Sequence, residues 1–389
     1  MKRRNRGHNK LSLLKRKKNV GYIGSTNNSN YEQNYYRMVD ESRGGKNKKR
    51  KKHKKLKKVL LILLCIFLAL LIITGAVFAY LYYSGKSQFE QENVNINLPA
   101  EIKAEDNGQT VFYKGKKYIY DDNIKTILCI GVDKNTETQQ KAEYFGEAGQ
   151  ADALYLLCID NAEKQYNVIS INRDSMIDVD EYDVTGKYLG TKTEQACLSF
   201  AYGDGKEKSC KNTVKAISRM LYNIPINTYF SLNKACIPNL NDMVDGVEVP
   251  EFDNDGNKTG KTIFLNGKAA YKYIHDRDIT KLNSNVIRME RQKSYIQSFA
   301  KKTIQKTKED ITTPLDLFDT ISIYSTTSLN ASKITYLTTN AFSDRNDIEI
   351  NFKSIAGKLS AGKDGYTEFN VDSDSLMDLV IEVFYDEVK

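Results

Sequence analysis

The feature that most constrains this chain is an uninterrupted apolar segment from Val59 to Tyr83, which contains no charged residue and no proline. At about 1.5 Å of rise per residue, a helix of this length crosses the roughly 30 Å hydrocarbon core of a bilayer. A cleaved signal peptide is the alternative, but its apolar region is only about 7–15 residues long and lies near the N-terminus. We therefore expect an uncleaved transmembrane helix.

This segment separates two parts of opposite charge. The 389 residues include 58 Lys and Arg and 49 Asp and Glu, yet 21 of the basic residues and only three of the acidic ones precede residue 59. Positive charge beside a span is retained in the cytoplasm, so we expect a cytoplasmic N-terminus and an extracellular C-terminal part. A nucleic-acid-binding tail is the alternative. Topology and attraction to anionic membrane lipid explain the basic run more simply, and we expect no nucleic acid partner.

Composition and hydrophobic pattern predict four regions. Residues 1–58 read as a basic, disordered cytoplasmic tail, 59–83 as the transmembrane helix, 84–109 as a polar stalk and 110–389 as one outer domain. Short apolar runs predict buried strands, and longer amphipathic stretches predict helices. The strands are expected at 126–132, 153–159 and 166–171, with a hairpin at 110–120; the helices are expected at 211–221, 234–244, 268–273, 287–304 and 373–385. This alternation indicates the α/β class.

Histidine and cysteine are too scarce outside the membrane for several kinds of chemistry. His275 is the only histidine after the span, so a multi-histidine zinc site is excluded and a Ser-His-Asp centre would have to use this residue. Cys129 and Cys158 lie in apolar runs and read as core residues. Possible disulfide partners are Cys197, Cys210 and Cys236.

Carboxylates recur at the predicted strand ends. Asp133 follows the first buried strand, Asp152 precedes the second, and Asp174 follows the third beside Arg173. Oxygen ligands gathered at one edge of an α/β sheet could hold Mg²⁺. The alternative is that these residues simply cap turns.

Arginines form a second group further along the chain. Arg277 follows His275, and Arg288, Arg291 and Gln292 have the spacing of neighbours on one helical face. Guanidinium groups that converge on one place suit a pyrophosphate, because each can bind phosphate oxygens in a bidentate manner. Solvated surface arginines are the alternative.

In their order along the chain, seven segments resemble the LytR-CpsA-Psr family of envelope glycopolymer transferases. The resemblance covers roughly residues 124–305 and rests on IGVD (130–133), QADALYLLCID (150–160), SINRDSM (170–176), ACLSFAYGDG (196–205), DGVEVPEF (245–252), LNGKAAYKYIHDR (265–277) and RMERQ (288–292). It implies a mixed central β-sheet flanked by helices, an α-β-α sandwich. It also implies a Gram-positive-type cell membrane location.

The resemblance assigns roles to the polar residues of these segments. Asp133 and Asp152 would bind Mg²⁺, and Asp152 or Asp174 would serve as the base. Arg173, Arg277 and Arg288, which would also be catalytic, and Gln292 would bind the pyrophosphate of a polyprenyl-linked glycan donor, with Gln150 and His275 at two further positions of the pattern. The helical spacing adds Arg291 to this set. Peptidoglycan would be the acceptor.

Three positions depart from the family pattern. Gln150 and His275 stand where arginines are usual, and Asn285 where an aspartate is usual. Pyrophosphate hydrolysis, or a membrane-anchored binding or regulatory protein with weakened catalysis, is therefore the alternative to transfer.

Overall fold

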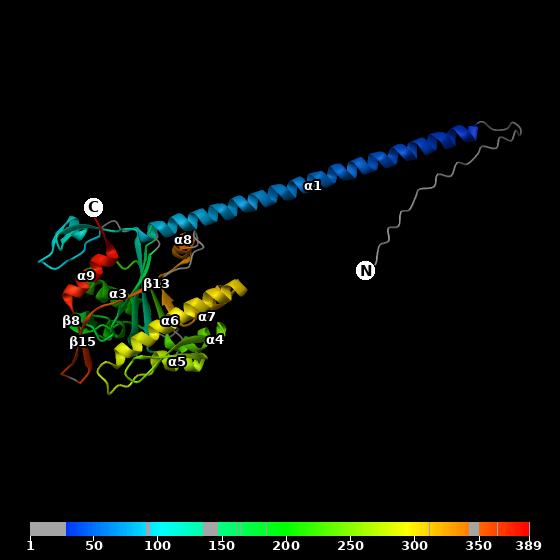
Figure 1. Cartoon of the computed structure of the whole chain (residues 1–389). Helices are drawn as coiled ribbons and strands as arrows, with labels where there is room; N and C mark the ends of the chain where they lie inside the picture. Colours follow the sequence, from blue (N-terminus) through cyan, green and yellow to red (C-terminus); the bar gives the residue numbers. More distant parts are fainter. Residues whose placement is uncertain are drawn as a thin grey trace, which may run out of the picture. The chain divides into compact units, whose positions relative to one another are not determined.

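The computed structural model describes residues 29–90, 94–134, 147–160, 162–163, 165–183, 185–310, 312–341, 350–363 and 365–388. Within them the chain divides into two units, Met1–Ala76 and Val77–Lys389. The first contains most of a long helix, α1 (Ser29–Phe89), and the second contains the folded domain (Figure 1).

Helix α1 includes the predicted transmembrane segment. Among the described residues, Lys54–Phe89 is the one stretch of helix long and apolar enough to cross a membrane. The tail was expected to be disordered, but α1 already begins at Ser29. Residues 29–58 are rich in lysine and arginine, which are good helix formers, and contain no proline. This composition accounts for the helix. Residues 1–28 lie outside the described part of the chain.

A mixed sheet of six strands forms the centre of the domain. Their order across the sheet is β12 (Ser325–Thr327), β9 (Thr228–Asn233), β4 (Ile124–Val132), β5 (Ala151–Asp160), β6 (Gln165–Ile171) and β13 (Ile350–Ser354). The pairs β4–β9 and β6–β13 are parallel and the others antiparallel. The apolar runs of the sequence therefore become the buried middle of the sheet, as predicted.

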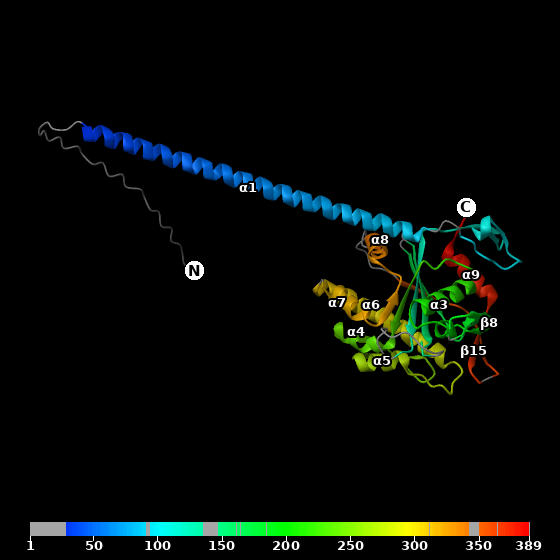
Figure 2. The ribbon, with the colours of Figure 1, turned by 180° about the vertical axis from the view of Figure 1, so that it is seen from behind.

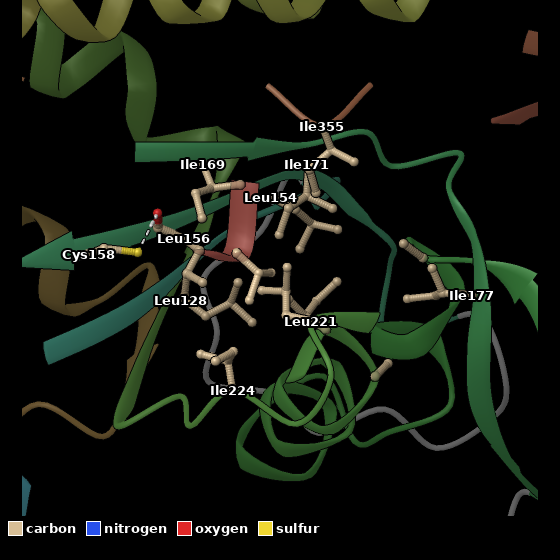
Figure 3. Packing of buried hydrophobic residues seen from close by; sticks show 14 of the residues in the cluster. Leu128, Leu154, Leu156, Cys158, Ile169, Ile171, Ile177, Leu221, Ile224 and Ile355 are labelled. Atoms are coloured by element: carbon tan, nitrogen blue, oxygen red, sulfur yellow. Dashed lines mark hydrogen bonds between the residues drawn. The ribbon is translucent and has the colours of Figure 1, made fainter. Parts of the chain in front are cut away.

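Helices cover both faces of this sheet (Figures 1 and 2). On one face lie α2 (Leu198–Ala201), α3 (Glu207–Met220) and α9 (Ser373–Phe384); on the other lie α4 (Ile237–Met243), α5 (Gly267–His275), α6 (Ser284–Glu309) and α7 (Thr313–Ser322). A short helix, α8 (Ala331–Ala341), lies beside the end of α1. Figure 3 shows Leu128 and Leu156 of the sheet beside Leu221 and Ile224, which follow α3. This is the α-β-α arrangement that the family resemblance implies.

Smaller β-structures surround the core. A second sheet has the order β1 (Lys103–Glu105), β2 (Thr110–Tyr113), β3 (Lys116–Tyr120) and β16 (Tyr385–Glu387). Three further hairpins are β7–β8 (Met176–Tyr182, Tyr188–Gln195), β10–β11 (Val247–Phe252, Lys258–Leu265) and β14–β15 (Gly357–Ala361, Thr367–Val371). Short 3₁₀ turns occur at Asp106–Gly108 and Lys234–Cys236.

Two expectations about the chain differ from the structure. Residues 84–109 were expected to form a stalk, but Phe89 and Ile96 are buried and β1 belongs to the second sheet. Apolar residues at irregular spacing in this polar stretch supply that packing, and the sequence pattern did not reveal it. All six cysteines are free, so none of the possible disulfides forms.

Candidate active site

The predicted acidic residues gather at one edge of the central sheet. Asp133 directly follows β4, Asp152 lies at the start of β5, and Asp174 follows β6. Because β5 is antiparallel to both of its neighbours, the start of β5 meets the ends of β4 and β6. The strand-end pattern therefore places the three carboxylates in one region, although it does not by itself give their roles.

A β-bulge directs Asp152 toward this edge. Gly131 pairs with Ala153 and Val132 pairs with Ala151, so Asp152 is the extra residue of β5. An extra residue in one strand bends the backbone and changes the direction of its side chain. The bulge gives Asp152 a position that strict alternation along β5 would not.

Asp152 is held between two arginines. Its carboxylate forms an ion pair with Arg173 and a second one with Arg288, whose Nη1 lies 3.3 Å from Oδ2. Arg288 also donates to the Asp152 carbonyl at 3.2 Å. Arg173 in turn donates to Gln150 Oε1 at 2.6 Å, and its Nε lies 3.4 Å from Asp174 Oδ1. Two arginines separated by more than 100 residues thus share one carboxylate.

Burial shifts the pKa of two of these groups. Arg288 is only 2% exposed, and burial, together with the charges of Arg277 and Arg173, lowers its pKa to about 10. Burial raises the pKa of the Asp174 carboxyl above its ordinary value, while Arg173, Arg277 and Arg288 oppose the rise. Among the residues that the structure describes, one oxygen of Asp174, Oδ2, has no hydrogen-bond partner. The arginines repel one another and attract any anion that lies between them.

Arg277 lies in the segment after α5 and is half-buried. Its charge acts on Asp174 and Arg288, yet its guanidinium forms no hydrogen bond or ion pair with any residue that the structure describes. This leaves its donors free for a ligand.

Lys234 is a site residue that the sequence analysis missed. It directly follows β9 and forms an ion pair with Asp133, while its Nζ lies 3.2 Å from His275 Nε2. The ion pair with Asp133 and the contact with Tyr271 raise the pKa of Lys234, although burial acts in the opposite direction. The only signal for β9 in the sequence is the partial alternation of TYFSLN (228–233), which is short and interrupted by polar residues.

The remaining predicted residues divide into two groups. His275 stacks on Tyr271 and contacts Asp276, and Gln292 accepts from the Tyr155 hydroxyl at 3.0 Å, so both lie at the site. Arg291 instead donates to the Asp276 carbonyl and lies over the Tyr273 ring. Spacing along α6 predicts Arg291 as a neighbour of Arg288, but its side chain packs against the end of α5 and does not line the cavity described next.

An apolar cavity of about 270 Å³ opens beside these polar residues. Two cross-strand rows of the sheet form its floor, Cys129–Tyr155–Phe230 and Gly131–Ala153–Leu232. Gly131 and Ala153 are too small to fill the space beneath α5 and α6. Asp133, Asp152, Lys234, His275, Arg288 and Gln292 also line the cavity. A ligand with an apolar body and a charged group matches this arrangement.

The carboxylates fit the donor preference of Mg²⁺. Asp133 and Asp152 offer hard oxygen ligands on the wall of one cavity. Among the described residues no group of three or more His, Cys, Asp or Glu side chains forms a metal site. Mg²⁺ is often bound by one or two carboxylates together with substrate phosphates, so two carboxylates suffice if a phosphate completes the site.

Fold and site together define a membrane-associated α/β protein whose apolar cavity adjoins a cluster of arginines and carboxylates. The model of the LytR_cpsA_psr family matches residues 80–382, and the chain belongs to this family.

Curated relatives and solved structures agree with this assignment. A "Polyisoprenyl-teichoic acid--peptidoglycan teichoic acid transferase TagU" of Enterococcus faecalis is 26% identical over 60% of this chain and 67% of its own length. The Bacillus licheniformis protein of the same name is 24% identical over 80% and 90%. The crystal structure of B. subtilis TagV matches with a TM-score of 0.50 at 20% identity over 67% of this chain and 96% of its own. Protein gbs0355 from Streptococcus agalactiae matches with a TM-score of 0.52 at 17% identity, covering 67% and 86%. At these identities the two structures support the fold alone.

Proposed function

We propose that this protein is a Mg²⁺-dependent phosphotransferase that moves a glycopolymer from a polyprenyl-pyrophosphate carrier to a hydroxyl of peptidoglycan. The observation that carries the proposal is an apolar cavity lined by Asp133, Asp152 and Arg288, with Arg173 ion-paired to Asp152. The names of the TagU relatives point to the same class of reaction.

The donor would bind with its two chemically different halves in two different places. The isoprenoid units next to the phosphate would enter the cavity between the sheet and helices α5 and α6, where Phe230, Leu232 and Ile296 are apolar neighbours. The pyrophosphate would lie at the mouth, within reach of Arg173, Arg277, Arg288 and Lys234. Guanidinium groups that are already fixed in place need little reorganisation when they bind it.

The reaction would be a phosphoryl transfer in which the acceptor hydroxyl attacks the phosphorus next to the sugar. A new bond forms between that phosphorus and the acceptor oxygen, and the bond to the bridging pyrophosphate oxygen breaks. The products are a glycan joined to peptidoglycan by a phosphodiester, and polyprenyl phosphate, while the hydroxyl proton passes to a base. The arginines would stabilise the negative charge on the leaving phosphate.

Asp133 and Asp152 are the proposed Mg²⁺ ligands, and the bound ion would neutralise charge on the pyrophosphate oxygens. Each carboxylate is paired with a cation in the structure, Asp133 with Lys234 and Asp152 with Arg173 and Arg288.

The two candidates for the base occupy different positions. Asp152 lines the cavity, whereas Asp174 is 3% exposed and lies behind Arg173. We favour Asp152 as the group nearer to an incoming hydroxyl. Asp174 would then orient Arg173 through its contact with Nε.

The test is product analysis with the full chain in lipid vesicles, using a polyprenyl-pyrophosphate disaccharide, Mg²⁺ and purified peptidoglycan. Transfer predicts glycan bound to peptidoglycan and an equal amount of polyprenyl phosphate. Release of glycan phosphate whether or not peptidoglycan is present would identify a hydrolase. Saturable Mg²⁺-dependent donor binding without any product would identify the binding or regulatory protein and contradict the transferase.

A further inference from the structure

We propose that Asn172 and Asn285 form an amide bridge that positions Arg288, and that its neutrality leaves the charge of Arg288 available to the donor's pyrophosphate. The two residues are 113 positions apart, and Asn285 Nδ2 donates to Asn172 Oδ1 over 2.6 Å. Asn172 is 4% exposed and Asn285 1%. This inference rests on the proposed function.

The orientation of the Asn172 amide is fixed by the backbone. The N–H of Asp174 donates to Asn172 Oδ1 at 3.0 Å. A backbone N–H can only donate, so the atom facing it must be the oxygen of the amide. The same oxygen accepts from Asn285, and position 285 therefore has to present a donor to Asn172.

The other end of the Asn285 amide contacts the arginine. Asn285 Oδ1 accepts from Arg288 Nη2 at 2.8 Å, one helical turn further along α6. The Nη2 of Arg288 also reaches the Asp152 carbonyl, so the guanidinium is fixed from two sides. The bridge thus connects the segment after β6, the start of α6 and the bulge of β5. All three carry residues of the proposed site.

Asparagine can satisfy both neighbours at once, whereas aspartate cannot. An aspartate at 285 would still accept from Arg288, but its second oxygen would face Asn172 Oδ1, and two acceptors at this distance repel. The aspartate would also add a negative charge next to Arg288, whose other counter-charge, Asp152, is already shared with Arg173. The amide of Asn285 avoids the repulsion with Asn172 Oδ1 and does not neutralise the charge of Arg288 further.

If the amide bridge positions Arg288, kcat and KM should respond differently to substitutions at positions 172 and 285. A merely structural role of the two asparagines would not produce this difference. In the full chain, Asn285→Asp should lower kcat/KM for the donor by about tenfold or more, through a lower kcat and a higher KM. Asn172→Ala removes the opposing oxygen. The double variant Asn172→Ala, Asn285→Asp should therefore regain kcat to within about threefold of Asn172→Ala alone, while KM stays high because the added charge remains.

Asn283→Asp is the matched control. Asn283 is exposed, lies two residues earlier at the start of α6 and has no side-chain capping hydrogen bond, so the same change there should leave both kinetic constants near wild type. Isothermal titration with inorganic pyrophosphate provides a second measurement, in which Asn285→Asp should weaken binding and Asn283→Asp should not.

The outcomes separate this inference from the proposed function. If the wild-type chain transfers glycan but Asn285→Asp matches it, or if the losses of the two single variants simply multiply in the double variant, the bridge is wrong and the transferase stands. If wild-type protein transfers nothing, the proposed function fails, while weaker pyrophosphate binding by Asn285→Asp would still support the bridge. Should Asn285→Asp not fold, equal kcat in wild type and Asn172→Ala would overturn the inference.

Discussion

Arg277 and Arg288 serve the same proposed pyrophosphate, but the fold holds them differently. Arg288 is buried and bonded to Asp152 and Asn285, whereas Arg277 is half-buried and has no hydrogen-bond or ion-pair partner among the described residues. Arg277→Lys should therefore lower transfer by about tenfold or more without changing thermal stability, because lysine keeps the charge and loses the planar fork. Arg288→Lys should lower both the rate of transfer and the thermal stability. Transfer assays and circular dichroism melts of the two variants measure these effects.

His275 provides the contrast to these lysine variants. Its ring stacks on Tyr271 and lies beside Lys234 on the cavity wall. His275→Arg should preserve or raise transfer, since a guanidinium at this position carries a permanent positive charge. Loss of transfer in His275→Arg, together with normal transfer in Arg277→Lys and Arg288→Lys, would mean that this cluster does not bind the phosphates.

The two proposed metal ligands should differ in their effect on stability. Asp133→Ala removes a half-exposed carboxylate whose ion-pair partner among the described residues is Lys234, and should abolish Mg²⁺-dependent transfer with little effect on folding. Asp152→Ala leaves the buried Arg288 and the largely buried Arg173 without their shared carboxylate, which should destabilise the domain by about 3–5 kcal/mol as well. Mg²⁺ titrations of activity and of the melting temperature test both variants. Transfer that keeps its Mg²⁺ dependence in Asp133→Ala would remove this residue from the metal site.

Asp174 makes stability depend on pH in a definite direction. Burial raises its pKa above the ordinary value of 3.8, so the folded protein binds this proton more tightly than the unfolded chain does. The stabilisation is fully present below the ordinary value and is lost as pH rises through the raised one. Asp174→Asn should therefore raise the melting temperature relative to wild type at pH 7, and the difference should shrink toward pH 4. A difference that grows on acidification would contradict this.

At the scale of elements, the sequence was most informative where burial is continuous. Strands β4, β5 and β6 were predicted because strands buried on both faces are apolar throughout. The aspartates next to the ends of these strands were predicted together with them. Strand β9 was not predicted, because TYFSLN is short and interrupted by polar residues, and Lys234 was missed with it. Nor could spacing predict the bulge at Asp152 or the direction of Arg291. Both depend on contacts between segments distant in sequence.

The end of α1 packs closely against α8, and this contact depends on one glycine. A Cβ at Gly85 would lie 2.9 Å from the Tyr336 Cβ and even nearer to the Ser332 backbone. Phe89 and Tyr336 pack nearby with ring centroids 5.7 Å apart, and Asn330 donates to Gln88. Gly85→Leu should therefore destabilise the domain by about 1–3 kcal/mol.

Gly75 offers a matched control on the same helix, since a Cβ there meets nothing within 4 Å. Circular dichroism melts of the detergent-solubilised chain should show a lower melting temperature for Gly85→Leu and none of this loss for Gly75→Leu. Equal melting of both variants would show that the α1–α8 contact adds nothing to stability.

For the whole molecule, the proposed chemistry requires one particular orientation in the membrane. The lipid-linked donor and peptidoglycan meet at the outer face, so the domain after α1 must be extracellular, as the basic run before residue 59 predicts. Protease added to intact protoplasts should digest the chain after residue 84 and leave the N-terminal tail protected, detected with tags at both ends. Permeabilised protoplasts, in which the tail should also be cut, provide the control. If the C-terminal domain is protected in intact cells, neither substrate can reach the cavity and the transferase proposal fails together with the orientation.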